Sequence, residues 1–320
     1  MILSTLVILA ALAASAPPSP PAPAREMTIG EGGSRLYGTY LAPASPVAGA
    51  EPVLILAGSG PTDRDGNNPL GVRAAPYRLL AEALAARGIP SLRPDKRGVA
   101  ASAAAAPSES ELRIQTFADD ARAWAARLRS ETGARCVWLL GHSEGGLHAL
   151  LAAQGDADVC GLILISSPGR RLGDVLREQL NANPANAPIL PEALRILAEL
   201  EAGRTVSGEV IHPALAPLFR PSVQPFMISL LALDPAEFAR RFDGPILLVQ
   251  GTTDLQTAVA DAQLLGAARS GITVRLIEGM NHVLKTAPPE PGANVATYSA
   301  PDLPLATGVA EAVADFIIAN

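Results

Sequence analysis

The feature that most constrains the fold of this chain is a serine held between glycines at the end of a short apolar run. Residues 137–140 are Val-Trp-Leu-Leu, and they lead directly into Gly141-His142-Ser143-Glu144-Gly145. Residues 145–154 follow with the small and apolar side chains of a packed helix. In this order of strand, sharp turn and helix, the pattern G-x-S-x-G puts the serine on a strained turn with its hydroxyl exposed. An ordinary strand-to-helix turn is the alternative interpretation.

The same turn predicts a nucleophile with an anion site beside it. The amide of Glu144 lies at the start of the following helix, where N–H groups point outward and the helix dipole favours a developing oxyanion. A serine hydroxyl such as that of Ser143 is a poor nucleophile at neutral pH, because it needs a base to take its proton and an acid to orient that base. The sequence should therefore supply a histidine and a carboxylate at the same edge of a sheet.

Short apolar runs alternate with helical stretches over most of the chain and predict an α/β fold. Such alternation requires crossover connections, which give a mostly parallel central sheet with helices on both faces. We expect strands at 35–41, 53–57, 90–93, 137–140, 161–165, 246–250 and 273–277, and helices at 77–86, 115–129, 145–154, 259–268 and up to residue 318. Residues 27–29 are expected to pair with the first of these strands as a hairpin.

One of the four histidines is placed to act as the base. His142 lies inside the turn, where its side chain should point away from that of Ser143, and His148 lies on the helix behind it. His212 falls in a helical region without predicted strands. His282 follows the predicted strand at 273–277 in a loop, at the edge of the sheet where Ser143 is expected. The position of His282 therefore predicts the general base.

The acid is predicted in the same way. Asp254 lies just past the predicted strand 246–250, whereas Asp243 precedes this strand and falls at the opposite end. Asp261, on the following helix, is the alternative acid. Ser143, Asp254 and His282 then all follow strands of one sheet, in the chain order of an α/β-hydrolase triad.

Two further segments make a narrower resemblance. Residues 57–67 read AGSGPTDRDGN and residues 93–98 read RPDKRG. With the GHSEGG turn at 141–146, they resemble a group of bacterial carboxylesterases within the α/β-hydrolase superfamily, and the resemblance extends from about residue 27 to the C-terminus. It implies a serine esterase that hydrolyses carboxylic esters with small or medium acyl groups through an acyl-enzyme, without metal or cofactor. It also implies that Ser59 supplies a second oxyanion amide beside that of Glu144.

The chain departs from this group at two places. Ala57 stands where many relatives have histidine, and residues 98–102 replace the common G-x-G-x-S continuation with Gly-Val-Ala-Ala-Ser. Four charged residues of the two motifs are expected to form a network that fixes both loops, namely Asp63, Arg64, Asp95 and Arg97. The alternative is that Arg64 or Arg97 binds an anionic group of the substrate.

The alternation of strands and helices breaks between about residues 170 and 241, which are helical in pattern and rich in Leu, Ala and Pro. A helical insertion between two halves of one sheet predicts a cap over the active-site edge. Phe219, Phe226 and Met227 are expected to contribute to an apolar acyl pocket. Surface helices without a role in substrate binding are the alternative.

Residues 1–24 are expected to be a signal peptide followed by a Pro-rich spacer, and residues 25–320 a single α/β-hydrolase domain. No charged side chain occurs before Arg25, and residues 2–14 are apolar except for Ser4 and Thr5. A helix of that length covers only roughly 20 Å of the ~30 Å hydrocarbon core. Residues 14–16, Ala-Ser-Ala, have the small-x-small pattern of a cleavage site. The protein is therefore expected to be periplasmic or secreted, with an uncleaved anchor as the alternative.

Cys136 and Cys160 are the only cysteines, and each stands at the start of a predicted strand. Neighbouring parallel strands lie about 4.8 Å apart, which is within the Cα separation that a disulfide tolerates. We therefore expect a disulfide at the sheet edge opposite the catalytic one, although a register shift of one residue would direct the sulfur atoms apart.

Two other functions remain open. An exported proline-releasing aminopeptidase would use the same triad, but it needs acidic cap residues to bind a free α-amine. A non-catalytic binding protein on a hydrolase shell is the alternative from a different class. The net charge of −6 without a basic run argues against nucleic acid as a partner, and the sequence leaves the oligomeric state open.

Overall fold

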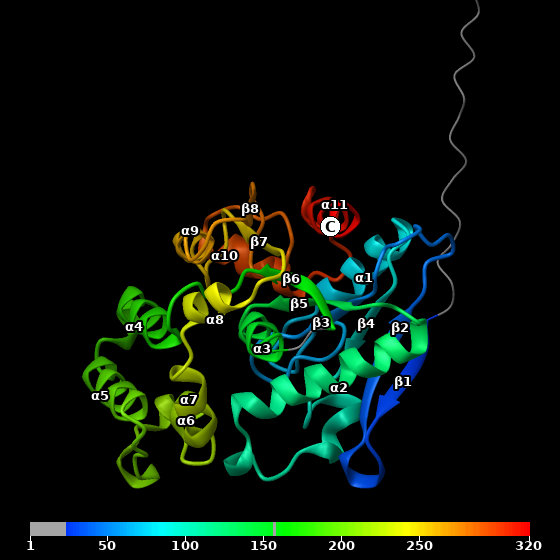
Figure 1. Ribbon diagram of the computed structural model, residues 1–320. Coiled ribbons are helices and arrows are strands. Elements are labelled where there is room, and N and C mark those ends of the chain that lie inside the picture. Colours follow the sequence, from blue (N-terminus) through cyan, green and yellow to red (C-terminus); the bar gives the residue numbers. More distant parts are fainter. Residues whose placement is uncertain (1–23, 156–157) are drawn as a thin grey trace, which may run out of the picture.

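The computed structural model describes residues 24–155 and 158–320, and their central layer is an eight-stranded sheet (Figure 1). The strands lie in the order β1-β2-β4-β3-β5-β6-β7-β8. Their bounds are β1 (Arg25–Ile29), β2 (Leu36–Leu41), β3 (Val53–Leu56), β4 (Ser91–Pro94), β5 (Val137–His142), β6 (Val159–Ile165), β7 (Ile246–Gly251) and β8 (Ile272–Ile277). The predicted signal peptide and spacer, residues 1–24, lie outside the described residues except for the last one.

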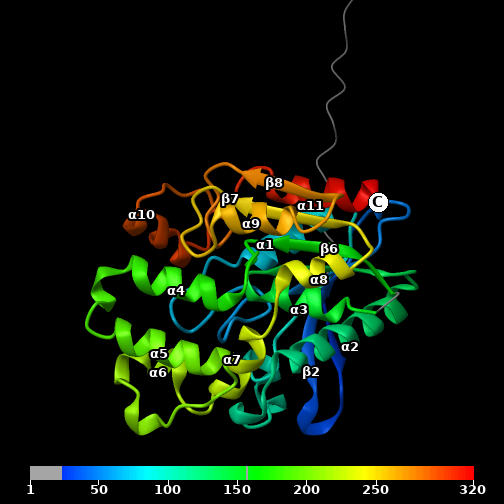
Figure 2. The same cartoon turned by 60° about the vertical axis from the view of Figure 1, so that its left-hand side comes forward.

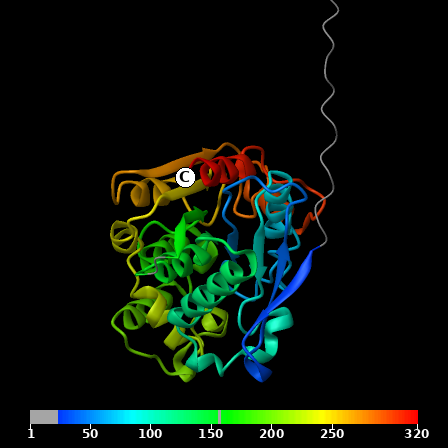
Figure 3. The same cartoon turned by 45° about the vertical axis from the view of Figure 1, so that its right-hand side comes forward.

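The sheet is parallel apart from one edge. Strand β2 pairs antiparallel with both β1 and β4, and every other pair is parallel. The β1–β2 hairpin and β8 therefore stand at opposite edges, as Figure 3 shows in blue and orange. This confirms the mostly parallel sheet and the N-terminal hairpin that the sequence predicts.

Helices cover both faces of the sheet. Helices α1 (Pro76–Ala86) and α11 (Val309–Ala319) share one core with alternate strand residues such as Trp138 and Leu140. On the other face, α2 (Ile114–Thr132), α3 (Glu144–Ala152) and α9 (Val259–Gly266) pack with the intervening positions such as Leu139. Strand β5 is buried at all six of its positions, which explains its continuous apolar run.

The chain between β6 and β7 is helical, and the described residues of this stretch contain no strand. Its α-helices are α4 (Leu172–Ala182), α5 (Leu190–Glu201), α6 (Ala216–Phe219), α7 (Gln224–Leu231) and α8 (Pro235–Arg241). Figure 2 shows α4 to α7 grouped together beside the sheet, while α8 leads back to β7. A further short helix, α10 (Pro291–Ala296), follows β8.

The predicted disulfide between Cys136 and Cys160 is confirmed, with the two Cα atoms 5.1 Å apart. The register of β5 and β6 shifts at this point, because Val137 pairs with Val159 while Trp138 pairs with Gly161. Cys160 is the extra residue of this bulge. The irregularity accommodates the bond at the amino ends of both strands.

None of the helices in the described part of the chain is both long enough and apolar enough to cross a membrane.

Candidate active site

Ser143 occupies the sharp turn between β5 and α3 with strained backbone angles. Its φ of 54° and ψ of −127° lie outside the regions that ordinary residues adopt. The flanking glycines are required because strand and helix pass closely: a Cβ on Gly141 would come within 2.2 Å of the Gly145 oxygen, and one on Gly145 within 2.3 Å of the Leu56 oxygen. The Ser143 amide donates to the Ile165 carbonyl at 2.9 Å, which holds the turn in place.

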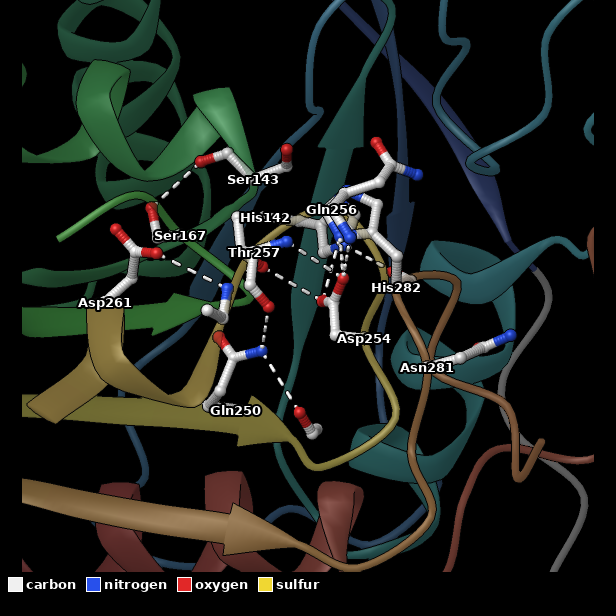
Figure 4. A network of polar contacts seen from close by, with 12 residues as sticks. His142, Ser143, Ser167, Gln250, Asp254, Gln256, Thr257, Asp261, Asn281 and His282 are labelled. Carbon is white, nitrogen blue, oxygen red and sulfur yellow. Dashed lines mark hydrogen bonds and ion pairs between the residues drawn. The ribbon is translucent and has the colours of Figure 1, made fainter. Parts of the chain in front are cut away.

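Asp254 and His282 form a buried hydrogen-bonded pair (Figure 4). The two Asp254 oxygens lie 2.9 and 3.1 Å from Nδ1 of His282. Asp254 also accepts from the backbone amides of Gln256 and Thr257 at 2.8 and 3.1 Å, and from the Thr257 hydroxyl at 3.0 Å. Since a carboxylate only accepts, the proton of this pair sits on Nδ1 and leaves Nε2 of His282 as a base.

Burial alone would favour the protonated form of Asp254. The hydrogen bond of His282 and the charge that His282 carries when protonated, together with the amides of Gln256 and Thr257, outweigh this and hold the Asp254 pKa well below its usual range. The carboxylate therefore stays charged and can orient the imidazole. Asp261, the alternative acid, instead accepts from Arg170 at 3.0 and 3.2 Å and from the Gly169 amide at 3.2 Å.

Among the hydrogen bonds of the described residues, none joins the Ser143 hydroxyl to His282. Both side chains follow carboxyl ends of strands in the same sheet, and catalytic hydrogen bonds commonly tighten only in the complex with substrate. The structure thus joins the predicted acid and base by hydrogen bonds, whereas the nucleophile and base share an edge without a hydrogen bond between them.

His142 has a larger part in the site than the sequence indicates. Its Nε2 lies 2.8 Å from the His282 carbonyl oxygen, and its Nδ1 lies 2.8 Å from the Tyr77 hydroxyl. Because the carbonyl only accepts, Nε2 carries the proton and Nδ1 accepts from Tyr77. Burial, followed by the nearby charge of His282, lowers the pKa of His142 to about 3, so this imidazole stays neutral. The sequence predicts only that the side chain of His142 points away from Ser143. The sequence signal for its contact with the His282 loop is its position at the end of a buried strand, beside the nucleophile.

The two predicted oxyanion donors lie on the same cavity as Ser143. Ser59 and Glu144 line it with the nucleophile, and neither backbone amide finds an acceptor in the described part of the chain. Gly58 packs directly against the nucleophile, since a Cβ there would come within 3.1 Å of the Ser143 Cβ.

This cavity has a volume of about 150 Å³. Helices of the insertion supply most of its aliphatic wall, namely Leu172, Val175, Leu176, Leu218, Met227 and Leu230. Gln179, Gln256 and Thr257 lie where it adjoins a second hollow of about 440 Å³, which is also lined by Arg170 and Glu178.

Of the three predicted pocket residues, Met227 lines the cavity but Phe219 and Phe226 do not. Phe219 is fully buried in the hydrophobic core. Phe226 packs edge to face against Phe117, with ring centroids 5.7 Å apart. Successive helical residues point about 100° apart because a turn takes 3.6 residues, so Met227 and Phe226 cannot both face the nucleophile.

The charged network of the two motif loops forms in part. Arg64 donates to Asp95 from its backbone amide, Nε and Nη2 at 2.7–2.9 Å, which joins the loops as predicted. Arg97 instead pairs with Asp120 of α2, and Asp63 accepts backbone amides of its own loop. Both arginines are engaged by carboxylates and neither lines the cavity of Ser143, which argues against their binding a substrate anion.

Solved structures share this architecture over nearly the whole chain. The esterase Est1E from Butyrivibrio proteoclasticus, with ferulic acid bound, covers 92% of this chain and 98% of its own at 16% identity, with a TM-score of 0.58. The proline iminopeptidase of Mycobacterium smegmatis covers 85% and 96% at 18% identity, with a TM-score of 0.55. Identities this low show the fold alone. This chain therefore has the fold of the α/β-hydrolases.

A family described as "Serine aminopeptidase, S33" matches residues 70–201, less than half of the chain. The esterase EstD of Thermotoga maritima is 28% identical over 241 residues, which are 72% of this chain and 54% of EstD. The chain therefore spans about half the length of this curated relative.

The described residues contain no group of three or more His, Cys, Asp and Glu side chains that could hold a metal ion.

Proposed function

We propose that this α/β-hydrolase is a serine esterase that cleaves carboxylic esters with small or medium acyl groups through an acyl-enzyme. One observation carries the proposal. The strained Ser143 lines one cavity with Ser59 and Glu144, whose backbone amides have no acceptor among the described residues. The Asp254–His282 pair follows strands of the same sheet. Likeness to EstD supports ester bonds as the target.

The proposed reaction has two halves that use the same groups. Ser143 Oγ attacks the ester carbonyl while Nε2 of His282 takes its proton, and the amides of Ser59 and Glu144 bind the resulting oxyanion. His282 then protonates the departing alcohol. In the second half it activates a water that releases the acid, while Asp254 holds the imidazole tautomer and stabilises its cation.

We propose that residues 170–241 form a cap on the domain 25–320 and set the acyl preference. The aliphatic wall beside Ser143 comes largely from α4 and α7, and the cavity is small. A short acyl chain fits this volume, whereas the adjoining hollow suits the alcohol portion of the ester.

We also propose that the enzyme acts in the periplasm or outside the cell. The apolar N-terminal segment supports export, and a disulfide persists in oxidising compartments.

An aminopeptidase remains the second candidate, because the family description and the iminopeptidase structure both favour it. Binding a substrate α-amine requires a carboxylate near Ser143. Three acidic cap residues are held in ion pairs: Glu178 with Arg170, Glu199 with Arg204 and Glu201 with Arg177. Of these three, only Glu178 lines the hollow beside the cavity. The aliphatic wall that α4 and α7 supply beside Ser143 favours the esterase.

A panel of p-nitrophenyl esters of increasing acyl length, beside aminoacyl anilides, tests this assignment. The proposal expects ester turnover with a preference for short chains and little anilide cleavage. Faster anilide cleavage would support the aminopeptidase. Failure of Ser143 to react with a fluorophosphonate probe would instead indicate a non-catalytic binding protein.

A further inference from the structure

Lysine is rare in this chain, and one of its lysines supports the loop of the proposed oxyanion hole. Only two of the 25 Lys and Arg residues are lysines, Lys96 and Lys285. Lys96 belongs to the DKRG segment that follows β4. Lys96 is half-buried.

The Lys96 ammonium binds two carbonyl oxygens that flank Ser59. Its Nζ donates to the Gly58 oxygen, and to the Gly60 oxygen at 2.7 Å. Other contacts fix the rest of the loop: the Gly58 amide donates to the Tyr77 hydroxyl at 3.0 Å, and the Thr62 hydroxyl donates to the Ser59 oxygen at 2.9 Å. The Ser59 amide is left without an acceptor in the described residues.

The Gly58 carbonyl and the Ser59 N–H belong to one peptide unit. In a planar trans peptide these two groups point in opposite directions, so Lys96 lies at the oxygen end while the N–H end is available to the cavity. A cation on a carbonyl oxygen polarises the amide, and hydrogen bonds aligned in this way strengthen one another at low local dielectric. The Ser59 N–H should therefore be a stronger donor to an oxyanion than an ordinary amide.

The side chain of Glu144, the first residue of α3, lies near the Lys96 ammonium and beside His148. Burial lowers the pKa of Lys96, but the nearby Glu144 carboxylate opposes that effect and favours the ammonium. Glu144 is itself kept ionised against its burial by His148, at 3.4 Å, and by Lys96. The side chain of Glu144 thus supports the charge behind one oxyanion donor, while its backbone amide is the other.

We propose that Lys96 is a positioning residue that orients and polarises the Gly58–Ser59 peptide for oxyanion binding. The single Nζ of a lysine ammonium is compact and can donate to two carbonyl oxygens at once. The guanidinium of arginine is larger and planar, and its donors are spread over several nitrogens. This role rests on the proposed esterase function and deepens it, since Lys96 acts on the transition state through Ser59 without touching the substrate.

The test compares Lys96→Met with the wild-type enzyme on p-nitrophenyl acetate and on a trifluoromethyl ketone, which forms an anionic tetrahedral adduct with the serine. Removing one oxyanion donor typically costs about 10²–10³ in kcat, and weakening it should cost about 10- to 100-fold. We expect kcat to fall and the ketone inhibition constant to rise by similar factors, with KM changed by less than about threefold.

Arg122→Met is the matched control. Arg122 also binds two backbone carbonyls, those of Leu151 and Ala152 at 2.7 and 2.9 Å, but near the end of α3 that is distant from Ser143. Its loss should lower stability and leave kcat and the inhibition constant unchanged.

Lys96→Gln separates charge from hydrogen bonding, and it provides a second folded variant if Lys96→Met does not fold. A kcat and inhibition constant close to those of Lys96→Met support polarisation by the charge. Wild-type values in either variant overturn the proposal. An inactive wild-type enzyme contradicts the esterase function itself, whereas an active wild type with an equally active Lys96→Met contradicts only the role of Lys96.

Discussion

Asp254 and His142 are both buried beside His282, yet burial has opposite consequences for them. Asp254 accepts hydrogen bonds from His282 and two backbone amides, which keep it an anion. His142 meets a carbonyl on one nitrogen and a hydroxyl on the other, and no carboxylate of the described residues forms a hydrogen bond with it, so it stays neutral. At the residue scale, His282 is therefore held at two points. Its imidazole binds the negative Asp254 carboxylate, and its backbone carbonyl accepts from the neutral His142.

Ser143→Ala should reduce ester hydrolysis by on the order of 10⁴ or more, because the nucleophile is lost. His282→Ala should be comparably inactive and Asp254→Asn somewhat less impaired. Initial rates on p-nitrophenyl acetate, with circular dichroism to verify folding, provide the measurement. Full activity of Asp254→Asn would assign the acid to another residue, and residual activity of Ser143→Ala near the wild-type level would place the nucleophile elsewhere.

Acidification should destabilise the fold through His142. An unfolded histidine titrates near 6.5, whereas the pKa of His142 is lowered to about 3 in the folded protein. Between these values the unfolded chain binds more protons than the folded protein. The free energy of unfolding therefore decreases as the pH decreases, by up to about 1.4 kcal/mol per pH unit. Urea unfolding at several pH values between about 7 and 4.5 measures the slope.

His142→Gln is the control for this pH dependence, because glutamine cannot be protonated in either state. The variant should be less stable at neutral pH but should lose less stability on acidification. Parallel slopes for the two proteins would contradict the neutral state of His142. Asp254 acts in a separate, more acidic window, since its stabilising contribution is lost only as the pH falls below the ordinary range of aspartate.

At the scale of elements, short segments outside the sheet join the catalytic loops to one another. Asn294 of α10 donates to the Thr253 oxygen at 2.9 Å and to the Pro288 oxygen at 2.8 Å. Its own Oδ1 accepts from Asn281, the residue before His282, at 3.2 Å. Because Thr253 precedes Asp254, one buried asparagine connects the loop of the acid with the loop of the base.

Asn294→Ala should lower the unfolding free energy by about 1–3 kcal/mol, because it leaves buried polar groups unpaired. It should also reduce kcat by about tenfold through misplacement of the Asp254–His282 pair. Asn320→Ala is the control, since the Asn320 amide makes an exposed bond to Phe316 at the C-terminus. Equal kcat values for both variants would show that the loops hold their geometry without Asn294.

The helices α4 and α7 should decide acyl length. Met227→Ala removes part of the pocket wall and should shift the preferred p-nitrophenyl ester toward longer chains, by several-fold in relative kcat/KM. Phe226→Ala is the matched control, because its ring packs on Phe117 outside the cavity. An identical shift in both variants would mean that the change acts through general loosening of α7.

At the scale of the whole molecule, the disulfide and the catalytic groups lie at opposite ends of the strands. Cys136 and Cys160 join the amino ends of β5 and β6, while Ser143 follows the carboxyl end of β5. The bond closes a loop with a sequence separation of 24 residues that contains the nucleophile turn and α3. Its effect should therefore concern stability and leave the chemistry unchanged.

Replacing both cysteines by serine should lower the unfolding free energy by about 3 kcal/mol. This is the free-energy equivalent of the conformational entropy that the unfolded chain loses when a loop of this size is closed. Urea unfolding of the variant and of the wild type with and without reductant measures it. We expect kcat on p-nitrophenyl acetate to be retained at moderate temperature. A stability unchanged by both treatments would contradict a structural role for the bond.

The sequence by itself determined the fold class and the identity of the main catalytic candidates. Their signals are local: the glycines around Ser143 report a close crossing of strand and helix, and Asp254 and His282 each follow an apolar run. Parallel strands bring their carboxyl ends to one edge, so position along the chain was enough to predict that the three residues meet there.

Only the tertiary structure decided which side chains face the cavity and which groups support it. Phe226 and Met227 are neighbours of similar character, and only the rotation of α7 about its own axis selects Met227 for the cavity. Lys96 and His142 act on backbone carbonyls of Gly58 and His282, which are distant in sequence. Every residue carries a carbonyl, so such contacts leave no mark in the sequence; they exist because packing brings particular loops together.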